Sequence, residues 1–211
     1  MRIDTAAAAT RLDGVLFDLL MAIMNSLEIW STAARDERRG LEWRDAVTAR
    51  MVAAGAYTPY EDLLTDAASE LNLHPNALTD LVDRWADMDP WPDAAAIQRL
   101  TVPYGFVTNC SMTLTRIAAE RSGLAPSLVL SAQEAGWFKP DARVYLEACR
   151  RLGTAPDRTA FIAGSPHDAD GASAAGLPTW LVRRRADQPA SVASVSVAGS
   201  LDELVESVMR W

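Results

Sequence analysis

Three apolar, strand-like segments of this chain each end in polar groups that could take part in chemistry. The polar groups at the three ends are Asp18, Thr108-Asn109 and Ser165-Pro166-His167-Asp168. Because the carboxyl ends of neighbouring parallel strands meet at one edge of a sheet, we expect these groups to converge on a single crevice. A carboxylate such as Asp18 can attack carbon or phosphorus to form a covalent ester that water later opens, provided that a cation and hydrogen-bond donors hold the charges.

Lys139 is the candidate cation, and it is the single lysine among the 20 basic residues of the chain. It lies in the loop Trp137-Phe138-Lys139-Pro140-Asp141, which precedes a helix predicted to start near Arg143. Arginine fills the ordinary surface positions here, and a compact ammonium is not interchangeable with a planar guanidinium. The sequence therefore predicts that Lys139 pairs with Asp18 and is not a solvated surface amine.

Strand-like and helical patterns define the elements that position these groups. Strands are predicted at 14–18, 104–109, 128–131, 160–165, 179–183 and 192–197, and helices between them. Such alternation predicts a parallel sheet with right-handed crossovers. Residues 27–100 instead show long amphipathic stretches, such as 60–71 and 76–85, that predict helices. We predict an α/β fold with a Rossmann-like parallel sheet core, helices on both faces, and a helical cap after the first strand. The core would comprise 1–26 and 101–211, and the cap 27–100.

Taken in chain order, the end of the first strand at Asp18, the Thr108-Asn109 pair, the Lys139 loop and the segment 165–168 resemble the four motifs of the haloacid dehalogenase superfamily. The resemblance covers most of the chain. Its most specific piece, Lys139-Pro140-Asp141-Ala142-Arg143-Val144-Tyr145, is similar to the L-2-haloacid dehalogenase branch, where the Lys and the Tyr both serve the site. By motif position, the resemblance implies that Asp18 is the nucleophile and that Lys139 and Asp168 are further catalytic residues. It implies substrate-binding roles for Thr108, Asn109, Tyr145 and Ser165.

The first motif departs from the family pattern. Phosphatases of the superfamily carry a second acid two residues after the nucleophile, where this chain has Leu20. Leucine cannot protonate an alkoxide leaving group, a contribution of about 10²–10⁴ in rate, whereas halide leaves without protonation. The dehalogenase branch usually has Tyr-Gly-Thr where this chain has Leu20-Met21-Ala22, and Asn where it has Ser165. No motif places the Arg with which that branch binds substrate carboxylate or halide, and Arg44 and Arg50 are candidates by region.

Three functions stay open. The leading one is a metal-independent, cofactor-free hydrolase of the 2-haloacid dehalogenase type that forms an ester on Asp18. The second is a Mg²⁺-dependent phosphatase with Asp18 and Asp168 on the metal, and the third is a catalytically degenerate binding protein that kept the fold.

Two structural alternatives are also open. Asp18 and Thr108-Asn109 could simply cap the helices that follow them. An alternative register with Arg11 at the nucleophile position needs a strand at 6–10, and those residues are poor strand formers.

Composition restricts the partners. The 211 residues carry a formal net charge of -8, which disfavours nucleic acid because that binding relies on clustered basic side chains. No apolar run is long enough to cross a bilayer. The first residues lack the apolar segment of a signal peptide, so we expect a cytoplasmic protein that acts on a small molecule. The resemblance also implies a possible homodimer.

Overall fold

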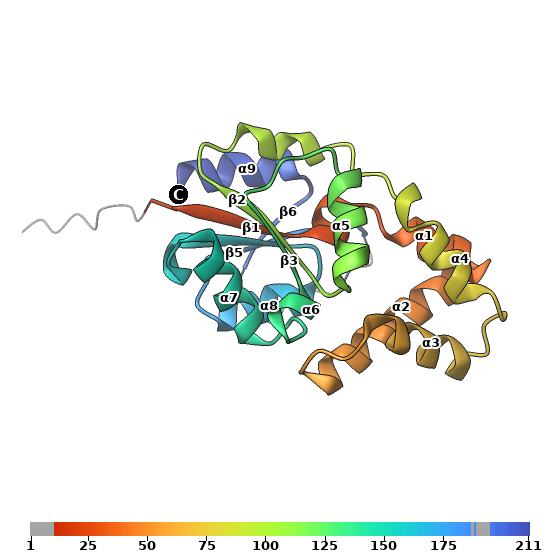
Figure 1. Ribbon diagram of the computed structural model, residues 1–211. Helices are drawn as coiled ribbons and strands as arrows, with labels where there is room; N and C mark the ends of the chain where they lie inside the picture. Colours follow the sequence, from red (N-terminus) through yellow and green to blue (C-terminus); the bar gives the residue numbers. More distant parts are fainter. Residues whose placement is uncertain (1–10, 187, 189–194) are drawn as a thin grey trace, which may run out of the picture.

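The computed structural model describes residues 11–186, 188 and 195–211. In this part of the chain a single six-stranded sheet forms the centre of the molecule (Figure 1). Its strands are β1 (Gly14–Asp18), β2 (Tyr104–Thr108), β3 (Leu128–Ser131), β4 (Thr159–Ala163), β5 (Thr179–Val182) and β6 (Ser196–Ala198). Their order is β3-β2-β1-β4-β5-β6 and every pairing is parallel. The predicted α/β fold with a Rossmann-like parallel sheet is confirmed.

β1 lies in the interior of the sheet between β2 and β4, and all five of its residues are buried. Asp18 is its last residue and stands beside Val107 of β2. The register with Asp18 at the strand end is therefore confirmed, whereas residues 6–10, the strand of the alternative register, lie outside the described residues. The last predicted strand, 192–197, overlaps β6 only at its end, and its residues 192–194 also lie outside the described part.

Helices cover both faces of the sheet because successive strand residues point to opposite sides. Val15 and Phe17 of β1 pack in one core with α5 (Met112–Arg121) and α9 (Leu201–Arg210). Leu16 packs in the other core with α7 (Ala142–Leu152) and α8 (Pro166–Ala174). Two short helices, α6 (Ala132–Ala135) and η4 (Pro156–Arg158), lie in the connections to α7 and β4. The sheet thus has the two helical layers that the sequence predicted.

The chain between β1 and β2 is helical, as predicted. Its elements are the π-helical turn η1 (Leu19–Ile23), α1 (Leu27–Ala34), α2 (Glu37–Ala54), α3 (Tyr60–Glu70), α4 (Ala77–Asp83), and the 3₁₀ turns η2 (Trp85–Asp87) and η3 (Ala94–Arg99). The helices α1 to α4 lie beyond the end of the sheet to which β1 points (Figure 1). Trp30 of α1 and Trp43 of α2 pack edge to face at 5.0 Å between ring centroids. The exact cap limits, 27 and 100, stay a prediction.

A short backbone pairing joins the inserted helices to the core. The linker between α2 and α3 forms an antiparallel bridge, Ala56 with Trp137. Two hydrogen bonds flank it, from the Tyr57 amide to the Gly136 carbonyl and from the Phe138 amide to the Gly55 carbonyl, both 2.9 Å. The linker is thus attached to the loop that continues into Lys139.

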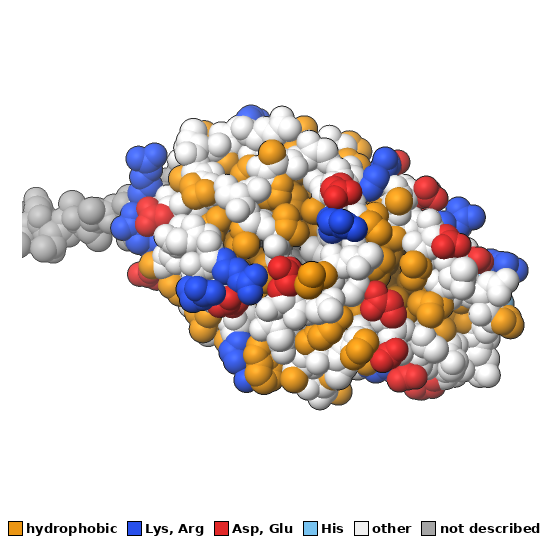
Figure 2. Space-filling view, in the orientation of Figure 1, with side chains coloured by type: hydrophobic (Ala, Val, Ile, Leu, Met, Phe, Trp, Pro, Cys, Tyr) orange, Lys and Arg blue, Asp and Glu red, His pale blue; other side chains and the backbone are white. Residues whose placement is uncertain are grey.

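The surface is charged and mixed. On the face in Figure 2, Lys and Arg side chains are interspersed with Asp and Glu and do not form one continuous basic area. None of the described helices is both long and apolar enough to cross a membrane.

Candidate active site

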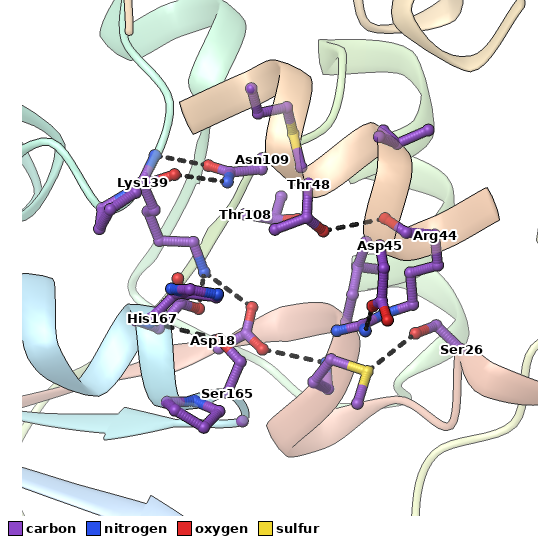
Figure 3. Close-up of a pocket in the computed structure, with 18 of the residues that line it drawn as sticks. Asp18, Ser26, Arg44, Asp45, Thr48, Thr108, Asn109, Lys139, Ser165 and His167 are labelled. Atoms are coloured by element: carbon purple, nitrogen blue, oxygen red, sulfur yellow. Dashed lines mark hydrogen bonds and ion pairs between the residues drawn. The ribbon is translucent and has the colours of Figure 1, made fainter. Parts of the chain in front are cut away.

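The Lys139 side chain reaches Asp18 at the carboxyl end of β1 (Figure 3). It also contacts Asp168, in the first turn of α8. Its ammonium nitrogen Nζ donates to Asp18 Oδ1 at 2.8 Å and to Asp168 Oδ2 at 2.6 Å. A third bond, at 3.3 Å, reaches the Val107 carbonyl of β2. The side chains of Lys139, Asp18 and Asp168 are 2%, 6% and 10% exposed. The predicted contact between Lys139 and Asp18 is therefore present, and Asp168 completes the cluster.

The three groups set one another's charge. Burial lowers the pKa of Lys139, but the attraction of Asp168 and Asp18 outweighs it and leaves that pKa above its ordinary value. Burial raises the pKa of Asp168 above its ordinary value, although Lys139 acts in the opposite direction. Three acceptors match the three donors of an ammonium, which limits the cost of burying it. The cluster thus keeps a protonated lysine beside a carboxylate that is more basic than an exposed one.

Asp18 is held by the turn that follows it. It is the N-cap of η1, and its Oδ2 accepts a hydrogen bond of 3.1 Å from the Met21 amide. Since Oδ1 faces Lys139, each carboxylate oxygen has a donor of its own. The capping role that the sequence left open is real here, and it coexists with the contact to Lys139.

Asn109 holds the Lys139 loop. Its Oδ1 accepts from the Lys139 amide at 2.7 Å, and its Nδ2 donates to the Lys139 carbonyl at 2.9 Å. The peptide bond from Lys139 to Pro140 is cis. Asn109 faces the cavity beside these residues, so it lies at the site while its amide group is occupied with the backbone of Lys139.

The remaining predicted substrate-binding residues fall into two groups. Thr108 and Ser165 both line the cavity: the Thr108 hydroxyl contacts Cys110 Sγ at 3.6 Å, and the Ser165 hydroxyl caps α8 by accepting from the Asp168 amide at 3.3 Å. Tyr145 is fully buried and does not line the cavity. Its hydroxyl donates to the Asp168 carbonyl at 3.2 Å, so it supports the turn that carries Asp168.

A cavity of about 970 Å³ opens over these groups, between the sheet end and the inserted helices. Helix α2 contributes several side chains at spacings of three and four residues, which place them on one helical face. Besides Arg44, the lining residues of α2 are Leu41, Asp45, Val47, Thr48, Ala49, Met51 and Val52, and sequence reasoning singled out none of these. His167 and Pro166, at the start of α8, also line the cavity. The helical periodicity of α2 could have indicated a shared face, but no motif shows which face meets the core.

The structure separates the two candidate arginines. Arg44 lines the cavity, with its side chain 22% exposed and its Nη1 3.1 Å from Asp45 Oδ1 (Figure 3). Arg50 is not among the lining residues and pairs with Glu70 of α3. Of the two, only Arg44 can meet a ligand beside Asp18.

The donor set does not suit Mg²⁺. This ion prefers an octahedral set of oxygen ligands, and Asp18 and Asp168 are the carboxylates that the phosphatase reading assigned to it. One oxygen of each is bonded to the Lys139 ammonium instead. Among residues 11–186, 188 and 195–211, no three His, Cys, Asp or Glu side chains are grouped so that they could hold a metal ion. The magnesium alternative is therefore not supported.

The chain is similar in sequence to curated (S)-2-haloacid dehalogenases. A (S)-2-haloacid dehalogenase 4A from Burkholderia cepacia is 26% identical over 191 residues, covering 83% of this chain and 82% of that protein. A (S)-2-haloacid dehalogenase from Pseudomonas putida is 27% identical and covers 82% of each.

Solved structures agree on the fold. The L-2-haloacid dehalogenase from Xanthobacter autotrophicus superposes with a TM-score of 0.82 at 19% identity, covering 93% of this chain and 98% of that one. A family model described as haloacid dehalogenase-like hydrolase matches residues 12–176. Since this match spans more than half of the sequence, the chain belongs to the haloacid dehalogenase-like hydrolase family.

Proposed function

We propose that this hydrolase is a 2-haloacid dehalogenase that acts on (S)-2-haloacids through a covalent ester on Asp18. The observation that carries the proposal is the position of Lys139, whose ammonium bridges Asp18 and Asp168 in a buried cluster. The (S)-2-haloacid dehalogenases that match the chain support the same substrate class. A solved structure of the Xanthobacter autotrophicus enzyme with chloropropionic acid covalently bound has a TM-score of 0.79 to this chain at 18% identity.

In the first step, a carboxylate oxygen of Asp18 attacks C2 of the substrate. The new C2–O bond forms as the carbon–halogen bond breaks, and the halide departs with the bonding electrons. Halide is a weak base and needs no proton, so Leu20 at the position of a phosphatase acid does not impede this step. Lys139 orients Asp18 for the attack through its bond to Oδ1.

In the second step, water attacks the Asp18 carbonyl carbon of the ester. The oxygen that came from Asp18 leaves with C2 as a 2-hydroxyacid, and Asp18 keeps an oxygen from water. Asp168 is the candidate base for this water because burial raises its pKa above the ordinary value. It takes one proton from the water and passes it to the departing 2-hydroxyacid oxygen, and the second water proton is released to solvent as Asp18 returns to a carboxylate. Lys139 lies where it can stabilise negative charge as the ester opens.

The substrate carboxylate would be bound by cavity residues other than Lys139, Asp18 and Asp168. Arg44 offers a guanidinium that can bind a carboxylate in a bidentate manner, and Asp45 already orients it. Thr108 and Ser165 bring hydroxyl groups to the same cavity. Tyr145 and Asn109 would act indirectly, through their bonds to Asp168 and Lys139.

Two assays separate the candidate functions. The purified protein is given 2-chloropropionate or an aryl phosphate, each with and without EDTA. Chloride release that EDTA does not affect supports the proposal, and phosphate release that EDTA abolishes would establish the phosphatase instead. Inactivity toward both substrates contradicts the proposal and favours the degenerate binding protein.

The ester itself is tested by a single turnover in ¹⁸O water. The mechanism requires the label to appear in the tryptic peptide that contains Asp18 and the first product to be unlabelled. Label found only in the product would show direct attack of water on C2. The cytoplasmic location, the homodimer and the lack of nucleic-acid partners stay predictions.

A further inference from the structure

The π-helical turn η1 follows Asp18 and carries one of the donors to its carboxylate. A backbone bond from the Met24 amide to the Leu19 carbonyl, at 2.9 Å, closes the turn. The Met21 amide of this turn is the donor to Asp18 Oδ2. The orientation of the carboxylate therefore depends on how firmly the turn itself is fixed.

Three successive carbonyls of η1 accept hydrogen bonds from outside the turn. The Met21 carbonyl accepts from the Trp91 indole Nε1 at 3.0 Å, and the Ile23 carbonyl accepts from the Trp91 amide at 2.9 Å. Between them, the Ala22 carbonyl accepts from Arg184 Nη2 at 2.5 Å. These donors come from segments about 70 and 160 residues further along the chain, so tertiary structure and not local sequence fixes this turn.

Arg184 is itself fixed on the side away from η1. Its guanidinium lies 4.9 Å from the centre of the Trp91 ring, and Nη1 pairs with Asp93 Oδ2 at 2.8 Å. Asp93 Oδ2 also accepts from the Leu201 amide at the start of α9. The two charged side chains are only 6% and 16% exposed. Burying such a pair is costly, so its position is better explained by orientation than by stability alone.

We propose that Trp91, Arg184 and Asp93 form a clamp that positions the Asp18 carboxylate by fixing η1. The chain of contacts runs from Asp93 to Arg184, from Arg184 and Trp91 to the η1 carbonyls, and from the Met21 amide to Asp18. None of the three clamp residues lines the cavity, so they are positioning residues and do not touch the substrate. Their effect on turnover rests on the proposed dehalogenase reaction, whereas their effect on η1 does not.

Two variants weaken the clamp gently. Trp91→Phe keeps an aromatic ring and the backbone amide but removes the indole donor to Met21. Arg184→Lys keeps a positive charge for Asp93 but lacks the fork that reaches Asp93 and Ala22 together.

Each variant has a matched control. Trp85→Phe removes a comparable indole bond, 2.9 Å to the Leu114 carbonyl, that does not touch η1. Arg99→Lys weakens an ion pair with Asp202 that joins η3 to α9 without contacting η1. Trp85→Phe therefore reports the general cost of losing a buried indole bond, and Arg99→Lys reports the cost of weakening an ion pair whose side chains are 48% and 57% exposed.

Hydrogen exchange tests the clamp without any activity. Amides in a peptide spanning 19–24 should exchange faster in Trp91→Phe and Arg184→Lys than in the wild type, and remain unchanged in Trp85→Phe and Arg99→Lys. Unchanged exchange in both clamp variants would overturn the proposal. This readout decides the clamp even if the wild type releases no halide and the proposed function fails.

Turnover of 2-bromopropionate tests the consequence for Asp18. We expect kcat to fall roughly threefold to tenfold in the clamp variants, the effect of losing one hydrogen bond, while KM changes little. Trp85→Phe and Arg99→Lys should keep the wild-type kcat. An equal loss of kcat in Trp85→Phe and Trp91→Phe would contradict the positioning role, because it would trace the loss to general destabilisation.

Discussion

The side chain of Asn109 spans the backbone of Lys139, accepting from its amide at 2.7 Å and donating to its carbonyl at 2.9 Å. Through these two bonds the end of β2 fixes the loop whose ammonium reaches Asp18. The alignment of nucleophile and cation therefore depends on a residue that bonds to neither charged group.

Asn109→Ala should lower kcat more than Asn109→Asp, because the aspartate can still accept from the Lys139 amide while the alanine makes neither bond. We expect a fall of about tenfold for Ala, since two hydrogen bonds worth about 1 kcal/mol each are lost and loop relaxation recovers part. Steady-state dehalogenation with 2-chloropropionate measures this. Asn76→Ala, at a position without a side-chain capping bond, is the control and should behave as the wild type. A rise in KM with constant kcat would instead indicate that Asn109 binds substrate.

Lys139→Met should destabilise the fold as well as abolish turnover. It leaves the buried carboxylates of Asp18 and Asp168 without their shared cation, a loss of about 3–5 kcal/mol. Urea unfolding of the two proteins measures the free-energy difference. Arg158→Met is the matched control, because its ion pair with Asp13 is about half exposed and should contribute no more than about 1 kcal/mol. Equal losses in both variants would contradict the charge arrangement described for the site.

The pH dependence of kcat/KM should show a wide plateau. Asp168 must be ionised to act as a base, and its pKa is raised above 3.8, so activity falls with decreasing pH at a higher pH than an exposed aspartate would give. Lys139 has a pKa raised above 10.5, so its ammonium persists at alkaline pH. The stability it contributes is complete below 10.5 and is lost as pH rises through its folded-state pKa.

A pH-rate profile with 2-chloropropionate, paired with circular dichroism at each pH, separates loss of catalysis from unfolding. Because Lys139 and Asp168 share a hydrogen bond, the apparent pKa values of the acid and alkaline limbs describe the pair and not either residue alone. An acid limb at or below pH 3.8, with the fold intact, would contradict a raised pKa in this buried pair and with it the base role proposed for Asp168.

Arg44→Gln should raise KM for 2-chloropropionate roughly 10- to 100-fold, since a charge-assisted bond to the substrate carboxylate is worth about 1.5–3 kcal/mol. Arg50→Gln, on the same helix but paired with Glu70 away from the cavity, should leave KM unchanged. Initial-rate measurements over a range of substrate concentrations give both values. If Arg50→Gln has the larger effect, the assignment of the carboxylate site to Arg44 fails.

The central features of the site could be predicted because they follow from local sequence. The apolar run ending at Asp18 predicted a buried parallel strand, and the single lysine predicted a cation paired with Asp18. The structure contains both the buried strand and the contact between Lys139 and Asp18. The choice between Arg44 and Arg50 could not be predicted, because it depends on which face of α2 meets the core. Likewise, no local pattern connects Arg184 with Ala22, which lie 162 positions apart in the sequence.

The bridge between Ala56 and Trp137 places the α2–α3 linker in the same hydrogen-bonded unit as the Lys139 loop. A rotation of α2 and α3 as one body would either break the two flanking backbone bonds or carry that loop with it. The cavity therefore cannot open at this end by such a rotation unless these backbone bonds break or the Lys139 ammonium is displaced. A change to residues 55–57 would therefore act on the backbone that leads into Lys139, although none of these residues lines the cavity above Asp18.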